Sequence, residues 1–512
     1  MPMTSGSRVP IPLAPVVVTW GTAVPAPPCT PTVSNSFGGP PALGRSRYAL
    51  KRRWRPLSPL AAAAGSCSPS TPVSADTDQL RVAVWPARIR KSFMPENRIL
   101  EGVRVLTLEQ VHALPWGTSF LADLGAQVIR VESVVHLQDR KSGPFPGGQS
   151  SEEWWNEGGN LAYFGARNKQ SLCLEVADPR GKEVFLKLAQ ECDIVTDNFR
   201  PGTMARYGFD HESLSKLNPR IITLSSTAFG YTGSWSRAGS RARTVDASCG
   251  MSYLTGYEDG PSRRASNNYM DHSVGNNVAY ALLLALYQRN KTGKGMRIDL
   301  TMQETGVSAI GPAILETQRG ISRPRLGCGH LWKSPHNVFP CRGEDRWITI
   351  VVSTDDEWRR LTKAMGGPAW AVDHRFDTAQ GRWTHRRQLG EHLAEWTSTQ
   401  DDQELMIHLQ ENGVSAGAVL TAEDLVANPH LQEREYIEEF VNVNAPQAGP
   451  RKYAGRPFRM PGVSMGIHSV AALGEHNEEI LREIAGLSGE EIAALADDGI
   501  ISNLPLPTES RP

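Results

Sequence analysis

Short apolar runs alternate with helical segments between Ile99 and Leu300, and this alternation constrains the fold more than any other feature of the chain. Strands are predicted at five places: Val103–Leu108, Gln127–Glu132, Cys192–Val195, Ile221–Ser225 and Met296–Leu300. The helical pattern between them is clearest over Asp178–Glu191. Such alternation predicts an α/β domain with a parallel sheet covered on both faces, and ligands at the carboxyl ends of its strands.

A second, smaller domain is expected beyond Gly320. The chain there is rich in loops, with a strand predicted at Trp347–Val352 and helices around Glu357–Met365 and Arg386–Ser398. The tail is predicted to be helical again over Glu475–Leu495. A long α/β region followed by a mixed one favours a two-domain protein.

Charge and cysteine content argue against several classes of protein. Lys plus Arg and Asp plus Glu both total 54, so net charge gives no reason to expect a nucleic-acid or anionic-membrane partner. The seven cysteines are scattered, without a CxxC pair or a zinc-like spacing, which predicts a reducing compartment and no metal. The apolar stretch Ala279–Tyr287 is much shorter than the roughly 20 residues of a membrane-spanning helix. We expect a soluble, cytoplasmic protein.

Residues 1–93 differ in composition from the rest of the chain. They are rich in Pro, Ser, Ala and Gly, hold the basic cluster Lys51-Arg52-Arg53, and contain only two acids, Asp76 and Asp78. This composition is also typical of a basic targeting or nucleic-acid-binding tail, and a genuine transit peptide would indicate mitochondria. We favour a disordered or spurious extension, with Met94 as an alternative start before the first strand.

Several motifs occur in the order found in one protein family. They are Leu121–Ala126, Val128–Glu132, Asp197–Gly202, Asn218–Arg220, Phe229–Gly230, Thr292–Gly295, Gly413–Gly417 and Gly474–His476. In this order the chain resembles the class III CoA-transferase family, which includes formyl-CoA, carnitine and succinyl-CoA transferases and the related alpha-methylacyl-CoA racemases. The resemblance runs from about Leu100 to Ile501.

The resemblance implies a fold and an assembly. Each subunit in the family forms a ring from a large Rossmann-like domain and a smaller α+β domain, and two rings interlock, so a homodimer is expected. On this basis residues 94–320 are the N-terminal part of the large, CoA-binding domain, and residues 321–425 are the small domain. Residues 426–512 form a linker and a C-terminal return to the large domain.

Asp271 is the catalytic residue that the resemblance implies. In the family, a carboxylate attacks the thioester of an acyl-CoA donor, and CoA passes through an enzyme-bound thioester to a carboxylic acid acceptor. Tyr269-Met270-Asp271 corresponds to the family's Asp motif, ahead of a predicted helix over Val274–Arg289 that stops at Gly293. The positive end of that helix favours the ionised, nucleophilic carboxylate. In the alternative interpretation, Asp271 only caps the helix.

Acyl-CoA is thus the expected substrate, and no tightly bound cofactor is implied. CoA carries phosphates and an adenine, so its site needs cations, backbone amides and an apolar wall. The positions that match the family are Val111, His112, Ala113, Lys169, Asn198, Phe199 and Arg206. The alternative for Lys169 and Arg206 is a solvated surface charge, and the alternative for Phe199 is a place in the core.

The sequence departs from the family at positions that bear on CoA binding. His112 stands where formyl-CoA transferase-like members have Gln, and Ser133 and Gln170 stand where Arg is frequent. These departures leave open how the nucleotide is held. Asp246 lies near the expected cleft, where it could raise the pKa of Asp271 or orient a substrate, although a structural role is the simpler interpretation.

Two other functions remain open from the sequence. An acyl-CoA racemase of the same fold would use a His and an Asp as paired acid and base, but Gly239–Ala242 lacks the histidine of that group's Gly-His-Asp motif. A non-catalytic subunit that only binds CoA is the third interpretation, and the presence of Asp271 argues against it. The sequence does not identify the donor and acceptor acids.

Overall fold

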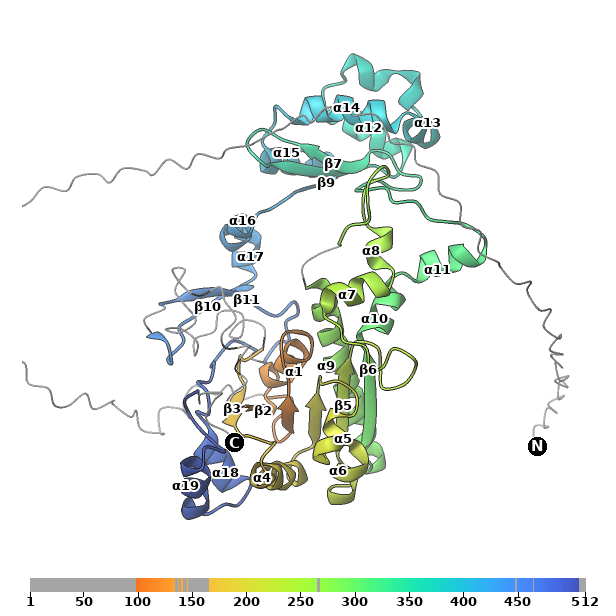
Figure 1. The fold of residues 1–512 in the computed structure, drawn as a ribbon. Coiled ribbons are helices and arrows are strands. Elements are labelled where there is room, and N and C mark those ends of the chain that lie inside the picture. Colours follow the sequence, from red (N-terminus) through yellow and green to blue (C-terminus); the bar gives the residue numbers. More distant parts are fainter. Residues whose placement is uncertain are drawn as a thin grey trace, which may run out of the picture. The chain divides into compact units, whose positions relative to one another are not determined.

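The computed structural model describes residues 98–133, 137, 140, 145, 165–264, 268–446, 449–463 and 465–505. The segment 1–93 and the alternative start at Met94 lie outside the described residues. A six-stranded sheet, in which every neighbouring pair of strands is parallel, organises the first half of the described chain (Figure 1). Its strands, in spatial order, are β3 (Gln170–Cys173), β2 (Gln127–Glu132), β1 (Arg104–Leu108), β4 (Ile194–Asp197), β5 (Ile222–Thr227) and β6 (Met296–Thr301).

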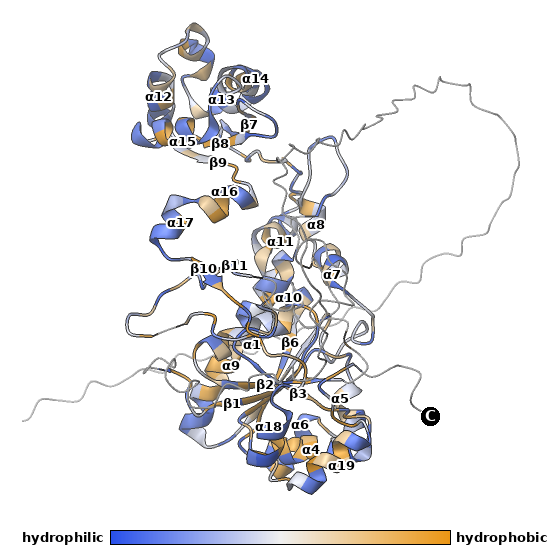
Figure 2. Cartoon of the chain, turned by 90° about the vertical axis from the view of Figure 1, so that its left-hand side faces the viewer, coloured by the Kyte–Doolittle hydropathy of each residue, from blue (hydrophilic) through white to orange (hydrophobic). Residues whose placement is uncertain are grey.

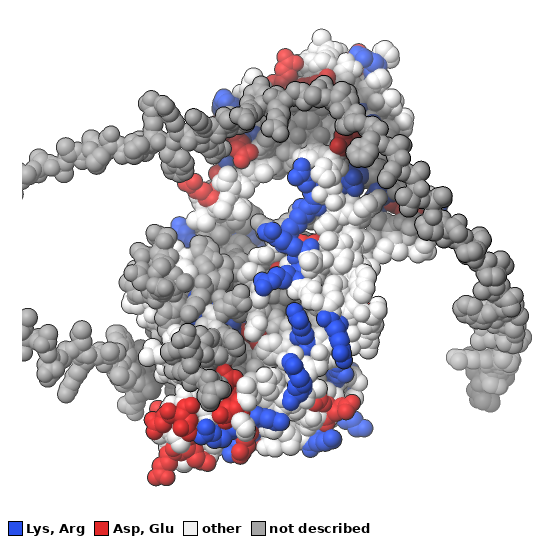
Figure 3. All heavy atoms as spheres, in the orientation of Figure 1, with Lys and Arg blue, Asp and Glu red and all other residues white. Residues whose placement is uncertain are grey.

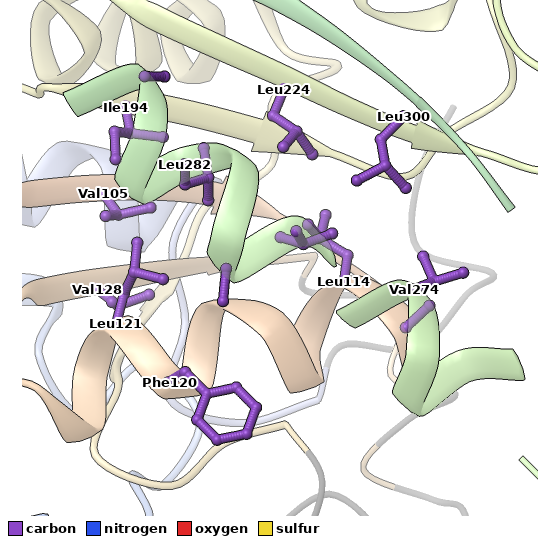
Figure 4. Close-up of a cluster of buried hydrophobic side chains, with 14 of the residues drawn as sticks. Val105, Leu114, Phe120, Leu121, Val128, Ile194, Leu224, Val274, Leu282 and Leu300 are labelled. Carbon is purple, nitrogen blue, oxygen red and sulfur yellow. The ribbon is translucent and has the colours of Figure 1, made fainter. Parts of the chain in front are cut away.

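Helices cover both faces of this sheet. They are α1 (Ala113–Asp123), α4 (Pro179–Gln190), α5 (Thr203–Tyr207), α6 (His211–Leu217), α9 (Tyr269–Thr292), α18 (Asn477–Glu483) and α19 (Gly489–Asp497). On one face, Val105 and Leu224 pack with α1 and α9 (Figure 4). On the other face, Leu106 packs with α4, α6, α18 and α19. The predicted parallel sheet with two covered faces is therefore confirmed.

Burial on both faces explains the apolar character of the strands. β4 and β5 are buried along their whole length, so neighbouring residues of one strand enter opposite cores. Figure 2 shows hydrophobic residues concentrated in the sheet. Strand β2 has the predicted bounds, whereas β4 begins two residues later than predicted, at Ile194, which pairs with Val105. Cys192 belongs instead to the turn that ends α4, where its N–H donates to the carbonyl of Ala189.

The helix that carries Asp271 begins earlier than predicted. Met270 and Val274 are one turn apart and both are buried in the core beneath α9, which extends the helix back to Tyr269. Asn268 holds the N-cap position with a φ of 59°, so the interpretation of Asp271 as the cap is wrong. Asp271 lies in the first turn. Gly293, with a φ of 74°, ends the helix as predicted.

Four further helices belong to the same part of the chain, two between β5 and α9 and two after β6. They are α7 (Ala242–Ser248), α8 (Met251–Leu254), α10 (Met302–Ala309) and α11 (Gly311–Gln318). The predicted helical tail over Glu475–Leu495 is two helices, α18 and α19, separated by a turn at Gly486. No helix among the described residues is long and apolar enough to cross a membrane.

A second sheet with its own core occupies the later part of the chain. It is antiparallel and consists of β7 (His336–Pro340), β8 (Trp347–Val351) and β9 (Ser415–Ala418). Its helices are η3 (Ala369–Val372), η4 (His374–Phe376), α12 (Asp355–Ala364), α13 (Ala379–Thr384), α14 (Arg386–Thr397) and α15 (Asp402–Glu411). The chain then forms α16 (Ala422–Ala427), α17 (Pro429–Glu433), β10 (Ile437–Phe440) and β11 (Arg451–Ala454).

Candidate active site

A cavity of about 1170 Å³ lies at the carboxyl ends of the central strands. Three of its walls are Gln110–Ala113 after β1, Asn198–Pro201 after β4, and Ser226–Phe229 at the end of β5. β1 and β4 are neighbours at the point where the strand order reverses, which is where open α/β sheets bind their ligands. The cavity exceeds the roughly 300–1,000 Å³ typical of small-molecule sites, and this size suits a long substrate.

Most of the residues predicted for the site come together in this cavity. Val111, His112, Ala113, Asn198, Phe199 and Asp271 all line it. They come from three separate parts of the chain. Lys169, Arg206 and Asp246 are not among its lining residues.

Asn198 holds two of the walls in place. Its side-chain oxygen accepts from the backbone N–H of Gln110 at 3.0 Å, and its amide nitrogen donates to the carbonyl of Gln110 at 2.7 Å. The loop after β4 is thereby fixed to the loop after β1. Asn198 thus shapes the cavity in addition to lining it.

The loop before α1 has an uncommon backbone conformation at the cavity. Val111 has a φ of 65°, which a β-branched residue rarely adopts, and its side chain is 58% exposed. Such outliers persist where the surrounding structure enforces them, and they cluster at ligand sites. Here the conformation brings His112 and Ala113 to the start of α1, where both residues line the cavity.

Two glycines allow α1 and α9 to cross with their backbones in contact. A Cβ atom on Gly117 would lie 2.6 Å from the carbonyl oxygen of Gly275. A Cβ on Gly275 would lie 2.6 Å from Cδ1 of Trp116 and 2.7 Å from the carbonyl oxygen of Ala113. Asp271 is one helical turn before Gly275. The close crossing therefore sets Asp271 beside the first turn of α1.

Asp271 is a buried carboxyl group that still faces the cavity. The residue is 7% exposed, and no hydrogen bond joins its side chain to another described residue. Burial and the negative charge of Asp246 raise its pKa to about 6, against the opposing charge of Arg264. Burial therefore has a larger effect on the pKa of Asp271 than the helix N-terminus, which was expected to favour the ionised form. The group is still roughly nine-tenths ionised at pH 7.

Asp246 and Arg264 form an ion pair next to Asp271. Nε of Arg264 donates to Oδ2 of Asp246 at 3.0 Å. Asp246 lies on α7 and is 5% exposed, whereas Arg264 lines the cavity. The arrangement gives Asp271 one repulsive and one attractive neighbour, so its proton affinity depends on both.

Lys169 is neither a surface charge nor part of the cavity wall. Its ammonium group lies 2.5 Å from Oε1 of Glu109 and donates to the hydroxyl of Thr118 at 2.7 Å, and the residue is 2% exposed. Burial lowers the pKa of Lys169 to about 8, against the attraction of Glu109. The pair links the segment before β3 to the loop after β1.

Arg206 and Phe199 lie near the sheet end in different settings. Arg206, on α5, donates from Nη2 to the hydroxyl of Thr203 at 3.3 Å and is exposed. Phe199 was predicted either to contact CoA or to belong to the core. It lines the cavity and also packs against the core beside α4. Its backbone N–H donates to Asp197 at 3.1 Å.

Four arginines give the cavity wall a strong positive charge. Arg200, Arg241, Arg243 and Arg264 line it, against the single carboxylate of Asp271 among the lining residues. Sequence reasoning did not single out these arginines. Arg200 lies inside the motif Asp197–Gly202, but nothing in the local sequence connects Arg241 and Arg243 with it.

The fold and the site together define a class of protein. A parallel α/β sheet with a large cationic cavity at its switch point, and a buried carboxylate in the wall, is suited to covalent or acid–base chemistry on a long anionic substrate. Within the described ranges, no group of three or more His, Cys, Asp or Glu side chains is placed to hold a metal ion.

Comparison with known proteins identifies the family. The family model "CoA-transferase family III" matches residues 100–477. The chain is 32% identical to succinyl-CoA–D-citramalate CoA-transferase of Chloroflexus aurantiacus, over 79% of this chain and 98% of that protein. It is 27% identical to formyl-CoA:oxalate CoA-transferase of Rhodopseudomonas palustris, and the match covers 79% of this chain and 98% of that protein. A solved CAIB/BAIF family protein of Brucella suis superposes with a TM-score of 0.67 and 27% identity, covering 76% of this chain and 100% of that one.

The chain therefore belongs to CoA-transferase family III. It is an enzyme of that class, and CoA thioesters and carboxylic acids are the substrates that fit the family. The resemblance inferred from the sequence motifs is confirmed.

Proposed function

We propose that this enzyme moves CoA from an acyl-CoA donor to a carboxylic acid through covalent intermediates on Asp271. The observation that carries the proposal is the buried Asp271 carboxylate in the wall of the cationic cavity. Its raised pKa leaves it ionised at neutral pH and makes it a stronger nucleophile than an exposed aspartate.

The first half of the reaction loads CoA onto the enzyme. A carboxylate oxygen of Asp271 attacks the carbonyl carbon of the donor thioester, the C–S bond breaks, and CoA leaves as a thiolate. The product is a mixed anhydride of Asp271 and the donor acid. The thiolate then attacks the Asp271 carbonyl carbon of the anhydride, which releases the donor acid and leaves an aspartyl–CoA thioester.

The second half repeats these steps with the acceptor. The acceptor carboxylate attacks the aspartyl thioester and displaces the CoA thiolate, which forms a second anhydride. The thiolate attacks the acceptor carbonyl, so that acyl-CoA leaves and the Asp271 carboxylate is restored. The backbone N–H of Ala113, the first residue of α1 and part of the cavity lining, can donate to the oxyanions of these steps.

An oxygen-18 experiment tests the carrier. If Asp271 carries the acyl group, one oxygen of a labelled acceptor carboxylate remains on Asp271 after each turnover. We therefore expect peptide mass spectrometry to find the label in the peptide that contains Asp271. Transfer without label in that peptide would contradict the proposal. Exchange of the α-proton of the acyl-CoA without transfer would instead indicate a racemase.

We further propose a homodimer of interlocked rings, each with a large and a small domain divided as predicted. The family supports this assembly, and α9 presents a face that suits a protein contact. Tyr280, Leu284 and Tyr287 are spaced along one side of α9 and are 64%, 48% and 59% exposed. Light scattering on the purified chain should give twice the mass of one chain, and a monomer would contradict the assembly. A cytoplasmic location stays a prediction.

A further inference from the structure

The proposed nucleophile lies in the first turn of α9, and the ends of a helix are the parts that open most easily. Asn268 holds the N-cap position with a left-handed backbone, and its side chain forms no capping hydrogen bond with a described residue. Attack on a bound thioester requires a fixed carboxylate, because a misplacement of about 1 Å costs about 100-fold in rate. Contacts from outside α9 must therefore hold the turn that carries Asp271.

The substrate takes its position from a different part of the molecule. Arginines line the cavity wall, and Figure 3 shows Lys and Arg side chains gathered over the region that α5 and α7 occupy in Figure 1. An anionic substrate is attracted to these cations, whereas the carboxylate that attacks it moves with α9. Transfer therefore depends on a rigid connection between the start of α9 and its surroundings.

Trp116, on α1, contacts the first two turns of α9, which packs against α1 (Figure 4). Its Nε1 donates to Oδ1 of Asn276 at 3.1 Å. Its ring meets the imidazole of His272 edge to face, with centroids 4.7 Å apart and 88° between the planes. A Cβ on Gly275 would lie 2.6 Å from Cδ1 of the indole, so the indole lies directly against that backbone. One tryptophan thus contacts α9 at three residues that closely follow Asp271.

These contacts enclose the turn that carries the carboxylate. Gly275 follows Asp271 by four positions, so the two residues lie one above the other on the same side of α9. Nδ1 of His272 donates to the carbonyl oxygen of Asn268 at 2.9 Å, so the imidazole connects the indole to the N-cap residue. The first turn of α9 is therefore held at its start through His272 and at its end through Gly275.

A buried cation holds the indole in turn. The guanidinium carbon of Arg167 lies 4.9 Å from the ring centroid of Trp116 and 5.7 Å from that of Phe120. Nη2 of Arg167 pairs with Oδ2 of Asp123 at 2.9 Å, and both side chains are almost completely buried. Trp116, Phe120 and Asp123 follow one another at helical spacing on one side of α1. The attraction between the cation and the ring therefore restricts the indole to one orientation.

We propose that Trp116 is a positioning residue for the transfer reaction, whose indole holds the first turn of α9 so that the Asp271 carboxylate keeps one orientation toward the cavity. Trp116 does not line the cavity, so it acts through Asp271 and makes no contact with the substrate. The inference rests on the proposed role of Asp271 as the nucleophile. Arg167 and Asp123 support the indole.

Steady-state kinetics of the full chain test the inference with three substitutions. Trp116→Ala should lower kcat about 100-fold. Trp116→Phe keeps a ring beside His272 but loses the indole N–H, and Asn276→Ala loses its acceptor, so each should lower kcat about three- to tenfold. The KM for acyl-CoA should change by less than about twofold, because none of these side chains lines the cavity. Trp347→Phe is the matched control, since it removes an indole N–H that donates to Asp345 at 2.8 Å in the second sheet, and it should leave kcat unchanged.

A double substitution distinguishes this contact from general packing. Trp116→Phe and Asn276→Ala remove the same hydrogen bond, so the double variant should be no slower than the slower single variant. Losses that multiply would overturn the inference, and so would an unchanged kcat in Trp116→Ala. A fall in kcat/KM caused by a raised KM alone would also overturn it, because the substrate rather than the carboxylate would then be misplaced.

Unfolding experiments test the same inference without turnover. The stability difference between the chain and Asp271→Asn should grow with pH and level off above about pH 6, because burial raises the pKa of Asp271 to about 6. With Trp116→Ala in both chains, the carboxylate reaches water, so the difference should shrink and level off nearer pH 4. Trp116→Phe should shift it in the same direction, and it serves alone if Trp116→Ala does not fold.

The two measurements separate this inference from the proposed function. A chain that transfers no CoA but shows the shift would refute the proposed function and support the positioning of Asp271 by Trp116. A chain that transfers CoA, and whose pH dependence is the same with and without the Trp116 substitution, would refute this inference alone.

Discussion

Replacement of Asp271 by Asn should stabilise the enzyme above pH 6 while it abolishes transfer. Burial and Asp246 raise the pKa of Asp271 from its ordinary 3.8 to about 6. Because the folded state then binds the proton more tightly than the unfolded state, stability falls as pH rises from about 4 to about 6. One unit of pKa shift corresponds to 1.36 kcal/mol, so the ionised Asp271 lowers the free energy of unfolding by about 3 kcal/mol when the pH is well above 6. About half of this destabilisation is present at pH 5.

Asparagine has the same shape and no charge, so it avoids this penalty. We expect Asp271→Asn to raise the free energy of unfolding by about 2–3 kcal/mol at pH 8 and by about half of that at pH 5. Urea unfolding followed by circular dichroism at the two pH values measures the difference. Asp259→Asn, at an exposed turn residue, is the matched control and should change stability little. A variant that is less stable at pH 8, or equally stabilised at both pH values, would refute the reasoning.

Three more substitutions test the neighbours of the site. Asp246→Asn removes a negative charge that raises the pKa of Asp271, so the acid limb of the pH profile of kcat/KM should move below about pH 6. An acid limb that stays in place would contradict the electrostatic effect of Asp246 on Asp271. Lys169→Met leaves the buried Glu109 with only Arg130, 3.8 Å away, as a cation, and should lower the free energy of urea unfolding by about 3 kcal/mol. A raised KM for acyl-CoA at unchanged stability would instead indicate that Lys169 is a CoA contact. Gly275→Ala should lower the free energy of unfolding by about 1–3 kcal/mol, and it should also lower kcat because the added methyl group displaces α1. Gly311→Ala is the control, because a methyl group there has open space around it, and it should change neither quantity.

The sheet was largely predictable because both of its faces are buried. Short apolar runs marked β1, β2 and β5 to within one or two residues, and the alternation of Met296, Ile298 and Leu300 with exposed polar residues marked the edge strand β6. Strand β3 was missed because Gln170–Cys173 is only four residues long and includes polar residues whose partners come from distant segments. The hydroxyl of Ser171, for example, donates to Glu132 and accepts from the N–H of Gly474. No local pattern reports such contacts.

The residues of the cavity were predictable only where a motif carried them. Asp271, Val111 and Asn198 were found through the family resemblance, and all three line the same cavity in the structure. The same resemblance could not show that Glu109 holds Lys169, because their pairing depends on the fold across 60 positions of sequence. Arg241 was missed for a similar reason, since only the placement of α7 brings it to the cavity.

Chemical trapping of the enzyme tests the central claim most directly. The full chain is incubated with a panel of acyl-CoAs, treated with hydroxylamine or borohydride, and digested for peptide mass spectrometry. Hydroxylamine should convert an activated Asp271 to a hydroxamate, and borohydride should reduce it to an alcohol, with at least one donor and only in the wild type. Asp271→Asn should give neither product. Transfer activity without modification at Asp271, or modification of a different carboxylate, would contradict the account.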